Sequence, residues 1–234
     1  MHDTGKLRAV SYNIRKAMGT DRRRRPGRIL DIINSLSPDI VLLQEADLRL
    51  FGRPTVLPRD AIEARTGLVP MLVAKTTHSL GWHGNAVLVR PEALQGPIIQ
   101  IDLPGLEPRG AVIAELELGG TKMRVVAAHL GLLRRSRRKQ LDALNTRLHG
   151  LAHLPTLVGG DFNEWSTQEG LGRLARHFEI LAPGKTFHVR RPIASLDRFA
   201  FSDGLQPIAY GVEINEVTRV ASDHYPIWID FRVA

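Results

Sequence analysis

Residues 157–165 read LVGGDFNEW, an apolar run that ends in a cluster of polar side chains. Side chains alternate between the two faces of an extended chain, so Asp161 and Asn163 are expected on one side while Phe162 turns toward the core. A carboxylate and a carboxamide at the end of an otherwise apolar segment are not what a structural core requires. The stretch therefore predicts a buried strand that ends at a functional site.

The composition is typical of a soluble globular protein, because 43% of the 234 residues are hydrophobic and 24% are charged. No linker-like segment divides the chain, so we expect a single domain over residues 1–234. We expect a cytoplasmic monomer, since the first residues lack an export signal and no apolar stretch could span a bilayer. The absence of cysteine excludes disulfides, thiolate metal sites and a cysteine nucleophile.

Eight short runs rich in Val, Ile, Leu or aromatic residues predict strands. They are LRAVSYNI (7–14), DIVLLQEAD (39–47), NAVLVR (85–90), AVIAELEL (111–118), KMRVVAAHL (122–130), PTLVGGDFN (155–163), LDRFAFS (196–202) and YPIWIDFRV (225–233). Helical spacing joins Ile29, Ile32, Ile33 and Leu36, and likewise Leu141, Leu144, Leu148 and Leu151. This α/β pattern predicts two stacked mixed sheets with helices outside them.

A third helix is predicted after Trp165. Ser166 and Glu169 have the spacing of a capping box, and Leu171 and Leu174 follow on one face. We expect Trp165 to be buried over this helix, although a tryptophan here could also stack on a base or lie at a lipid surface.

Polar residues that a core would not choose recur at five strand ends: Asn13, Glu45, His129, the pair Asp161 and Asn163, and the pair Asp223 and His224. Each alone is typical of a turn, but the repetition indicates a shared site. The set is rich in oxygen donors, which favour hard cations such as Mg²⁺ or Mn²⁺. Signatures of serine hydrolases, nucleotide-binding loops and zinc proteases are absent. The pattern thus favours metal-assisted attack of water on phosphorus.

The segments SYNI, LLQEAD, AAHLG, GGDFNEW, SLDRFAFS and ASDHYPI together resemble the motifs of the endonuclease/exonuclease/phosphatase superfamily. The resemblance runs from about Val10 to Trp228, and it is greater to small bacterial members whose substrates are poorly defined. It implies a four-layer α/β sandwich with the active site at one edge of the paired sheets. It also implies a divalent-metal-dependent phosphoesterase.

The resemblance implies a role for each residue at this edge. Glu45 matches the metal-binding glutamate, with Asn13 beside it as a ligand either directly or through water, and Asp223 near the metal, bound directly or through water. Asp161 is expected to orient and polarise the attacking water, and the Asn163 amide to donate to a phosphoryl oxygen.

The two histidines are also matched by the resemblance. His224 takes the place of a histidine paired with a carboxylate, here Asp197, and acts either as a base or as a cationic phosphate ligand. His129 matches a second histidine that contacts the phosphate or assists the leaving group. Asn85 resembles a residue that faces the substrate, and a turn residue is an equal interpretation.

The chain carries 32 basic and 24 acidic residues, a net charge of +8, with basic runs at DRRRRPGR (21–28) and LLRRSRRKQ (132–140). The runs are either solvated surface segments or contacts for an anionic partner. We expect the second run to bind substrate through Arg134, Arg135, Arg137 and Arg138. Nucleic acid is the preferred substrate, a phospholipid head group the alternative, and a non-catalytic polyanion-binding protein a third hypothesis.

Overall fold

The computed structural model describes residues 5–50, 52–166 and 169–234, and these form two sheets of six strands each. The first sheet has the order β11 (Leu205–Val212), β12 (Ile227–Val233), β1 (Lys6–Asn13), β2 (Ile40–Gln44), β4 (Ala86–Val89) and β3 (Val69–Pro70). The second has the order β5 (Leu94–Leu103), β6 (Arg109–Leu118), β7 (Thr121–His129), β8 (Thr156–Asp161), β10 (Asp197–Phe201) and β9 (Glu179–Leu181).

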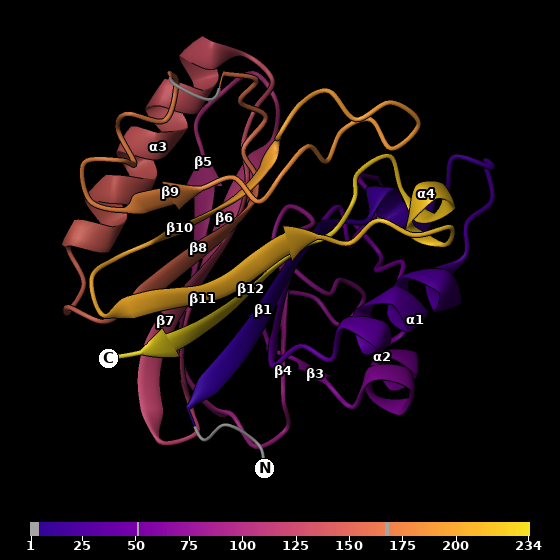
Figure 1. Ribbon diagram of the computed structural model, residues 1–234, viewed down its shortest axis with the longest axis horizontal. Coiled ribbons are helices and arrows are strands. Elements are labelled where there is room, and N and C mark those ends of the chain that lie inside the picture. The colour runs from indigo at the N-terminus through magenta and orange to yellow at the C-terminus, as the bar shows by residue number, and fades with distance from the viewer. Residues whose placement is uncertain (1–4, 51, 167–168) are drawn as a thin grey trace.

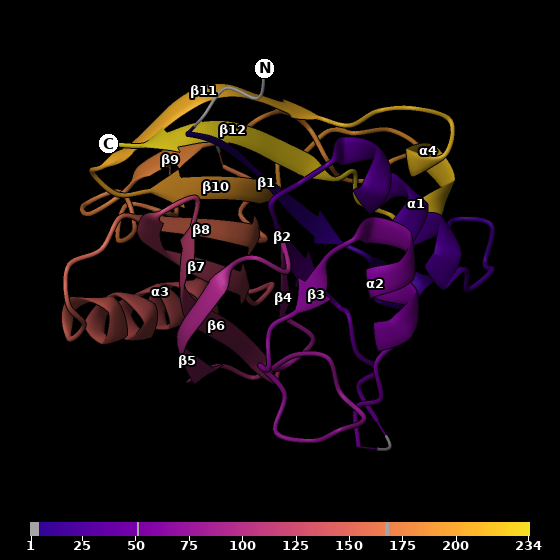
Figure 2. The same ribbon diagram turned by 90° about the horizontal axis from the view of Figure 1, so that it is seen from below.

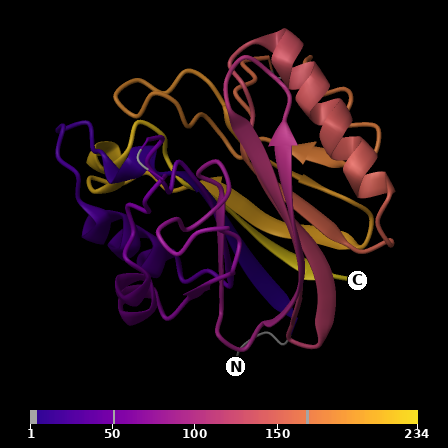
Figure 3. The same ribbon diagram turned by 180° about the vertical axis from the view of Figure 1, so that it is seen from behind.

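Helices cover the outer face of each sheet (Figures 1 and 2). The first sheet carries α1 (Pro26–Leu36) and α2 (Arg59–Thr66), with the short η1 (Arg15–Ala17) and α4 (Thr218–Ala221) nearby. The second sheet carries α3 (Arg134–His149), which lies against its outer face (Figure 3). The predicted four-layer sandwich of two mixed sheets between helices is confirmed. None of the helices in the described ranges is long and apolar enough to cross a membrane.

Strand alternation sorts the core into three layers. Odd-numbered residues of β1 and β8, such as Ala9 and Leu157, pack between the two sheets. Even-numbered residues face the helices: Val10 packs with α1 and Val158 with α3. The same alternation continues to the strand ends, so that Asn13 and Asp161 turn into the space between the sheets.

Two strand–helix–strand units place the site. Strands β1 and β2 are parallel and joined through α1, and β7 and β8 are parallel and joined through α3. The carboxyl ends of parallel strands lie at one edge of a sheet, so the residues that follow all four strands share one edge of the sandwich. All other described strand pairs are antiparallel.

The first predicted stripe is confirmed as α1, of which Pro26 is the first residue, and the second is confirmed as α3 for Leu141, Leu144 and Leu148, whereas Leu151 lies after the end of this helix. The predicted third helix includes residues 167 and 168, which lie outside the described residues, and over the part that is described it is wrong. Backbone N–H of Glu169 does donate to the Ser166 hydroxyl at 2.9 Å, but residues 172–177 form turns rather than a helix. Gly170, with a φ of 92°, explains the failure, because glycine there adopts a backbone conformation that a helix cannot contain.

Trp165 was expected to be buried over that helix, and this too is wrong. Its side chain is 56% exposed and meets only the edge of Phe187 among the aromatic rings described, with centroids 6.3 Å apart. Besides the short strands β3 and β9, two longer strands, β5 and β11, were not predicted. Both are edge strands with largely exposed side chains and a proline in each, Pro97 and Pro207, so the sequence shows little apolar alternation there.

Candidate active site

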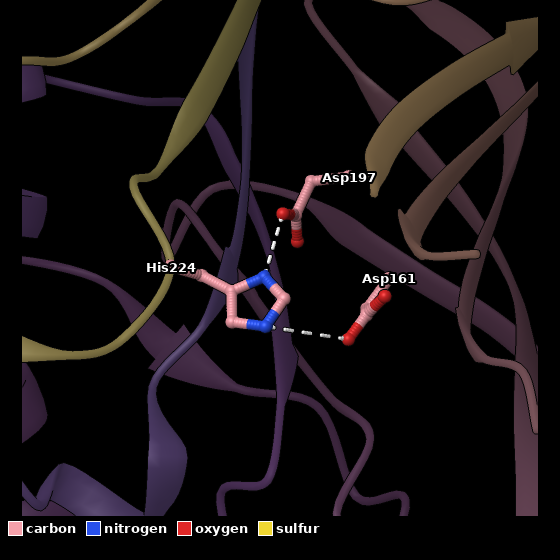
Figure 4. Close-up of side chains that lie close together, drawn as sticks. All are labelled: Asp161, Asp197 and His224. Carbon is pink, nitrogen blue, oxygen red and sulfur yellow. Dashed lines mark hydrogen bonds and ion pairs between the residues drawn. The ribbon is translucent and has the colours of Figure 1, made fainter. Parts of the chain in front are cut away.

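Register between neighbouring strands of the second sheet brings three site residues together. His129 at the end of β7 lies opposite Asp161 at the end of β8, and Asp161 lies opposite Asp197 at the start of β10. All three share the inner face because they continue the alternation of Ala127, Gly159 and Phe199. His224 reaches them from the loop before β12, which belongs to the first sheet (Figure 4). The site therefore spans both sheets.

His224 and Asp197 form a buried dyad. His224 Nδ1 lies 2.7 Å from Asp197 Oδ2, and His224 Nε2 lies 3.7 Å from Asp161 Oδ2. Burial acts to lower the pKa of His224, but the two facing carboxylates outweigh it and raise this pKa to about 10. His224 is therefore an imidazolium near neutral pH, with Nδ1–H donating to Asp197 and Nε2–H directed toward Asp161.

Asp161 is the centre of the cluster. Its Oδ2 accepts a hydrogen bond from Asn13 Nδ2 at 3.0 Å, which crosses from one sheet to the other, and its Oδ1 accepts from the backbone N–H of Asn163 at 2.9 Å. Burial raises the pKa of Asp161 to about 6, against the attraction of the His224 charge, which lowers it. A carboxylate with this pKa can hold or release a proton near neutral pH.

His129 is neutral near neutral pH, whereas His224 is a cation. Burial, together with the nearby Arg109 guanidinium, lowers the pKa of His129 well below its usual value. Arg109 Nη1 lies 2.8 Å from His129 Nε2 and 3.0 Å from Nδ1. The neutral ring has its Nε2 3.4 Å from Asp161 Oδ2, so this contact is not an ion pair.

Two of the candidate metal ligands, Asn13 and Glu45, lie beside this cluster at the ends of β1 and β2, and the third, Asp223, lies in the loop before β12. Asn13 is hydrogen-bonded as described above and accepts from the backbone N–H of Arg15 at 3.1 Å. Glu45 contacts the Lys16 ammonium, and its Oε1 lies 3.7 Å from Arg49 Nη2. Asp223 Oδ2 lies 3.3 Å from Arg15 Nε. Each of the two carboxylates therefore faces a cation.

Within the described residues, one group of three acidic or histidine side chains has ligand atoms all within 4.8 Å of one another, and it consists of Asp161, Asp197 and His224. An imidazolium cannot ligate a metal, because both of its nitrogens carry protons. With His224 held as an imidazolium by Asp197 and Asp161, this group suits proton transfer, and Glu45, Asn13 and Asp223 remain the donor set that the motifs predict for an ion.

Asn163 and Asn85 both bind backbone. Asn163 has a φ of 49° and donates from its side chain to the Leu130 carbonyl at 2.9 Å, which fixes the loop after β8 against the loop after β7. Asn85 is fully buried and donates to the carbonyls of Trp82 and Gly110 at 3.1 and 2.9 Å. These bonds favour the interpretation of Asn85 as a turn residue.

The basic run of residues 132–140 divides into two kinds of side chain. Arg134, Arg135 and Arg138 are exposed in the first turns of α3. The interpretation of Arg137 as part of an exposed substrate-binding surface is wrong, because its guanidinium is buried. It donates to Glu164 Oε2 at 2.8 Å and to the Leu132 carbonyl. Arg137 thus ties α3 to the loop after Asn163.

Sequence reasoning missed the basic side chains that set the charge of the site, namely Lys16, Arg49 and Arg109. Lys16 and Arg49 are close in sequence to Asn13 and Glu45, so proximity alone could have indicated them. Arg109 is 20 residues from His129 and becomes its neighbour only because β6 pairs with β7.

Comparison with known proteins agrees with these motifs. The sequence model of the Endonuclease/Exonuclease/phosphatase family matches residues 10–224, and the chain belongs to this family. Members of the family are hydrolases that act on phosphate esters. The resemblance inferred from the motifs is confirmed. A search of the curated proteins found no match.

Several solved structures are similar to the chain. A functionally unknown conserved protein from Enterococcus faecalis V583 has 18% identity and a TM-score of 0.79, covering 97% of this chain and 100% of that one. A family protein from Bacteroides thetaiotaomicron has 19% identity and a TM-score of 0.79, covering 98% of both chains. The human Nocturnin catalytic domain has 22% identity and a TM-score of 0.74, covering 98% of this chain and 95% of that one. These likenesses show the shared fold.

Proposed function

We propose that the protein is a divalent-metal-dependent phosphodiesterase that hydrolyses its substrate by attack of water on phosphorus, with nucleic acid as the preferred substrate. The observation that carries the proposal is the buried Asp161 carboxylate beside the His224–Asp197 dyad. A base with a pKa of about 6 lies 3.7 Å from an imidazolium with a pKa of about 10. The pair offers a proton acceptor and a cationic donor in one site at neutral pH.

In the proposed reaction Asp161 accepts a proton from the attacking water while the water oxygen bonds to phosphorus. The phosphorus–oxygen bond to the leaving group breaks, and that oxygen takes up a proton from solvent or from an acid in the site. His224 cannot be the base because its nitrogens are already protonated. Its Nε2–H instead donates to a phosphoryl oxygen, and the positive charge stabilises the charge that grows there in the transition state.

The donor set at the ends of β1 and β2 and in the loop before β12 fits a hard cation. Two carboxylates, from Glu45 and Asp223, and the Asn13 amide oxygen are the donors that Mg²⁺ or Mn²⁺ accepts. Both carboxylates already face a basic side chain, which is the charge that an ion would replace. These three residues would hold the metal, and a bound metal would supply polarisation of the phosphoryl group.

Nucleic acid is the first candidate substrate because the surface near the site is strongly basic. Residues 22–25 are four exposed arginines, and the first turns of α3 expose Arg134, Arg135 and Arg138. The two groups lie over different sheets, the first beside α4 and the second at the start of α3 (Figure 1). An extended polyanion could contact both, and phosphate contacts of this kind give affinity that falls with salt.

A phospholipid head group is the second candidate, favoured by exposed apolar side chains around the dyad. Phe187 lies against His224, with centroids 4.9 Å apart, and next to Trp165. Ile193 donates from its backbone N–H to the Phe187 carbonyl at 2.9 Å and is 58% exposed. Leu132 and Leu133 are also more than half exposed. Exposed apolar side chains among arginines are the surface expected of an enzyme that acts at an anionic membrane.

The test is a panel of phosphate esters assayed with Mg²⁺, with Mn²⁺ and with EDTA. The panel contains single-stranded and duplex DNA, RNA, vesicles of anionic phospholipid and bis(p-nitrophenyl) phosphate. We expect diester turnover that EDTA abolishes and that Asp161→Asn reduces strongly. Asp142→Asn on the exposed face of α3 is the matched control and should retain wild-type rates. Absence of turnover for every ester with either metal would refute the proposal and favour a polyanion-binding protein.

A further inference from the structure

A cavity of about 410 Å³ lies beside the candidate metal ligands and plays no part in the chemistry described above. Its walls come from three segments: the loop after β2, the loop between β3 and β4, and β5. The charged and aromatic residues that line it are Arg49, Arg53, Lys75, Trp82, His83 and Asp102.

The cavity adjoins the active site, because the two share lining residues. Arg49, Arg53 and His83 also line a smaller crevice of about 50 Å³, whose other walls include Glu45 and His129. Arg49 extends between the two spaces, because its Nη2 lies 3.7 Å from Glu45 Oε1. A group bound in the cavity would therefore be part of the molecule whose phosphate lies at Glu45 and Asp161, or its immediate neighbour.

The net charge of the cavity is positive. Lys75 and Arg53 have no acidic side chain within ion-pair distance in the described parts of the chain. The single carboxylate in the walls, Asp102, is 77% exposed and interacts with His83. Unpaired cations in a concave site attract anions, and the partly enclosed walls strengthen that attraction by reducing contact with water.

Hydrogen bonds and ring contacts hold the cationic groups in place. Arg53 Nη1 donates to His83 Nδ1 at 2.9 Å, so His83 carries its proton on Nε2 and donates to Asp102 Oδ1 at 2.9 Å. The Lys75 ammonium lies over the Trp82 ring, 4.4 Å from its centroid. Two cations from separate loops are thus fixed in orientation before any ligand binds, which lowers the entropy cost of binding.

We propose that this cavity binds a second phosphate group of the substrate, distinct from the phosphate that is attacked. The inference rests on the proposed phosphodiesterase function, because it assigns the position of one phosphate to Glu45 and Asp161. Among the described residues, Arg53 and Lys75 supply two positive charges without a carboxylate partner, and Arg49 adds a third that it shares with Glu45, which matches a phosphate of charge −1 or −2 better than a neutral sugar or an acyl chain. The second phosphate is either the neighbouring phosphodiester of a polynucleotide or a terminal phosphate on a small substrate.

The experiment compares substrates with and without a second phosphate. One pair is the p-nitrophenyl ester of thymidine 5′-phosphate with and without a 3′-phosphate, which tests a terminal phosphate. The other is the same ester with and without a 3′-linked nucleotide, which tests a neighbouring diester. The variants are Lys75→Met and Arg53→Gln, with Lys122→Met at the exposed start of β7 and Arg147→Gln on the exposed face of α3 as matched controls.

We expect the wild type to prefer at least one of the two-phosphate substrates by about tenfold in kcat/KM, mostly through KM, because remote contacts contribute uniform binding. Both cavity variants should reduce that preference to about twofold or less, and both controls should keep it. The pair that shows the preference identifies the source of the phosphate. A preference that survives in both cavity variants, or no preference in the wild type, would overturn the proposal.

Direct binding separates this inference from the proposed activity. Pyrophosphate, titrated into the metal-free protein by calorimetry, should bind Lys75→Met at least about fivefold more weakly than Lys122→Met if the cavity is an anion site. That result would support the cavity even if no diester were hydrolysed. Equal affinity in the two variants would refute the cavity even if the enzyme proved active.

Discussion

Substitution of Asp197 by asparagine tests the dyad most directly. Asp197 is fully buried, its Oδ2 accepts from His224 Nδ1 at 2.7 Å, and its Oδ1 has no protein partner in the described residues. Asparagine has nearly the same shape but no charge, so the strand should stay in place while the imidazolium loses its nearest counter-charge. We expect kcat to fall and the fold to remain.

The magnitude follows from the kind of bond that is lost. A hydrogen bond to a charged partner contributes about 1.5–3 kcal/mol, and about 1.4 kcal/mol corresponds to tenfold in rate. We therefore expect kcat to decrease by about 10- to 150-fold. Removing the Asp197 charge should also lower the pKa of His224, since that charge is the largest factor raising it.

The assay is the pH profile of kcat/KM on bis(p-nitrophenyl) phosphate. Activity requires Asp161 ionised and His224 protonated, so the wild-type rate should rise through a pKa of about 6 and fall through a pKa of about 10. In Asp197→Asn the upper limb should move to lower pH. Asp203→Asn, in the exposed turn just after β10, is the control. A variant with wild-type kcat and an unmoved upper limb would refute the assigned role of the dyad.

Four further outcomes are expected. Glu45→Gln should raise the Mg²⁺ concentration needed for half-maximal activity without loss of thermal stability, and unchanged metal dependence would remove Glu45 from the metal site. His224→Ala and Asp161→Asn should each lower kcat by about 10²-fold or more. The double mutant should lose less than the product of the two single losses, and a loss equal to that product would show that the two residues act independently. Glutamine at three exposed arginines should raise KM and flatten salt dependence for a long polynucleotide more than for a small aryl diester, and equal effects would assign them to the catalytic centre or the fold. These arginines are Arg134, Arg135 and Arg138. Asp230→Asn should lower the free energy of unfolding by about 2 kcal/mol at pH 7, because Asp230 accepts from Arg8 at 2.6 and 2.9 Å. Arg8 holds the pKa of Asp230 below its usual value. The contribution of this pair to the free energy of unfolding is therefore complete above about pH 4 and is lost as pH falls through the lowered pKa. Urea titrations at several pH values would check this dependence.

Much of the site could be predicted from the sequence because local rules determine it. Alternation along a strand decides which face a residue takes, and this places Asn13, His129 and Asp161 between the sheets. The parallel arrangement of β1 with β2 and of β7 with β8 then brings their ends to one edge. The first step needs only the local pattern, whereas the shared edge was predicted from the family resemblance, because strand pairing is a contact between distant segments.

The charge states could not be predicted in this way. Two histidines in one site differ because Asp197 faces His224 while Arg109 lies against His129, and both neighbours come from other strands. Arg137 presents the same difficulty. A run of arginines at the start of a helix is typical of a solvated surface. Arg137 is nevertheless buried, and its guanidinium pairs with Glu164, 27 residues away. Such pairs depend on tertiary packing, which a local pattern does not contain.

The two sheets contribute different halves of the site, and their spacing therefore matters for function. The first sheet supplies the candidate metal donors, the second supplies Asp161, and the Asn13–Asp161 hydrogen bond joins them across the gap. Gly159, two residues before Asp161 on the same face, allows the close approach, because a Cβ there would lie 2.7 Å from Leu42 Cδ1 on the opposite sheet. Gly159 of the GGDFNEW motif thus serves the packing between the sheets, Gly160 allows close approach to the Ala128 backbone of β7 in the same sheet, and the polar residues that follow serve the site. Any change in the separation of the sheets would therefore change the distance between the metal donors of the first sheet and the Asp161 base of the second, and a substrate phosphate has to contact both.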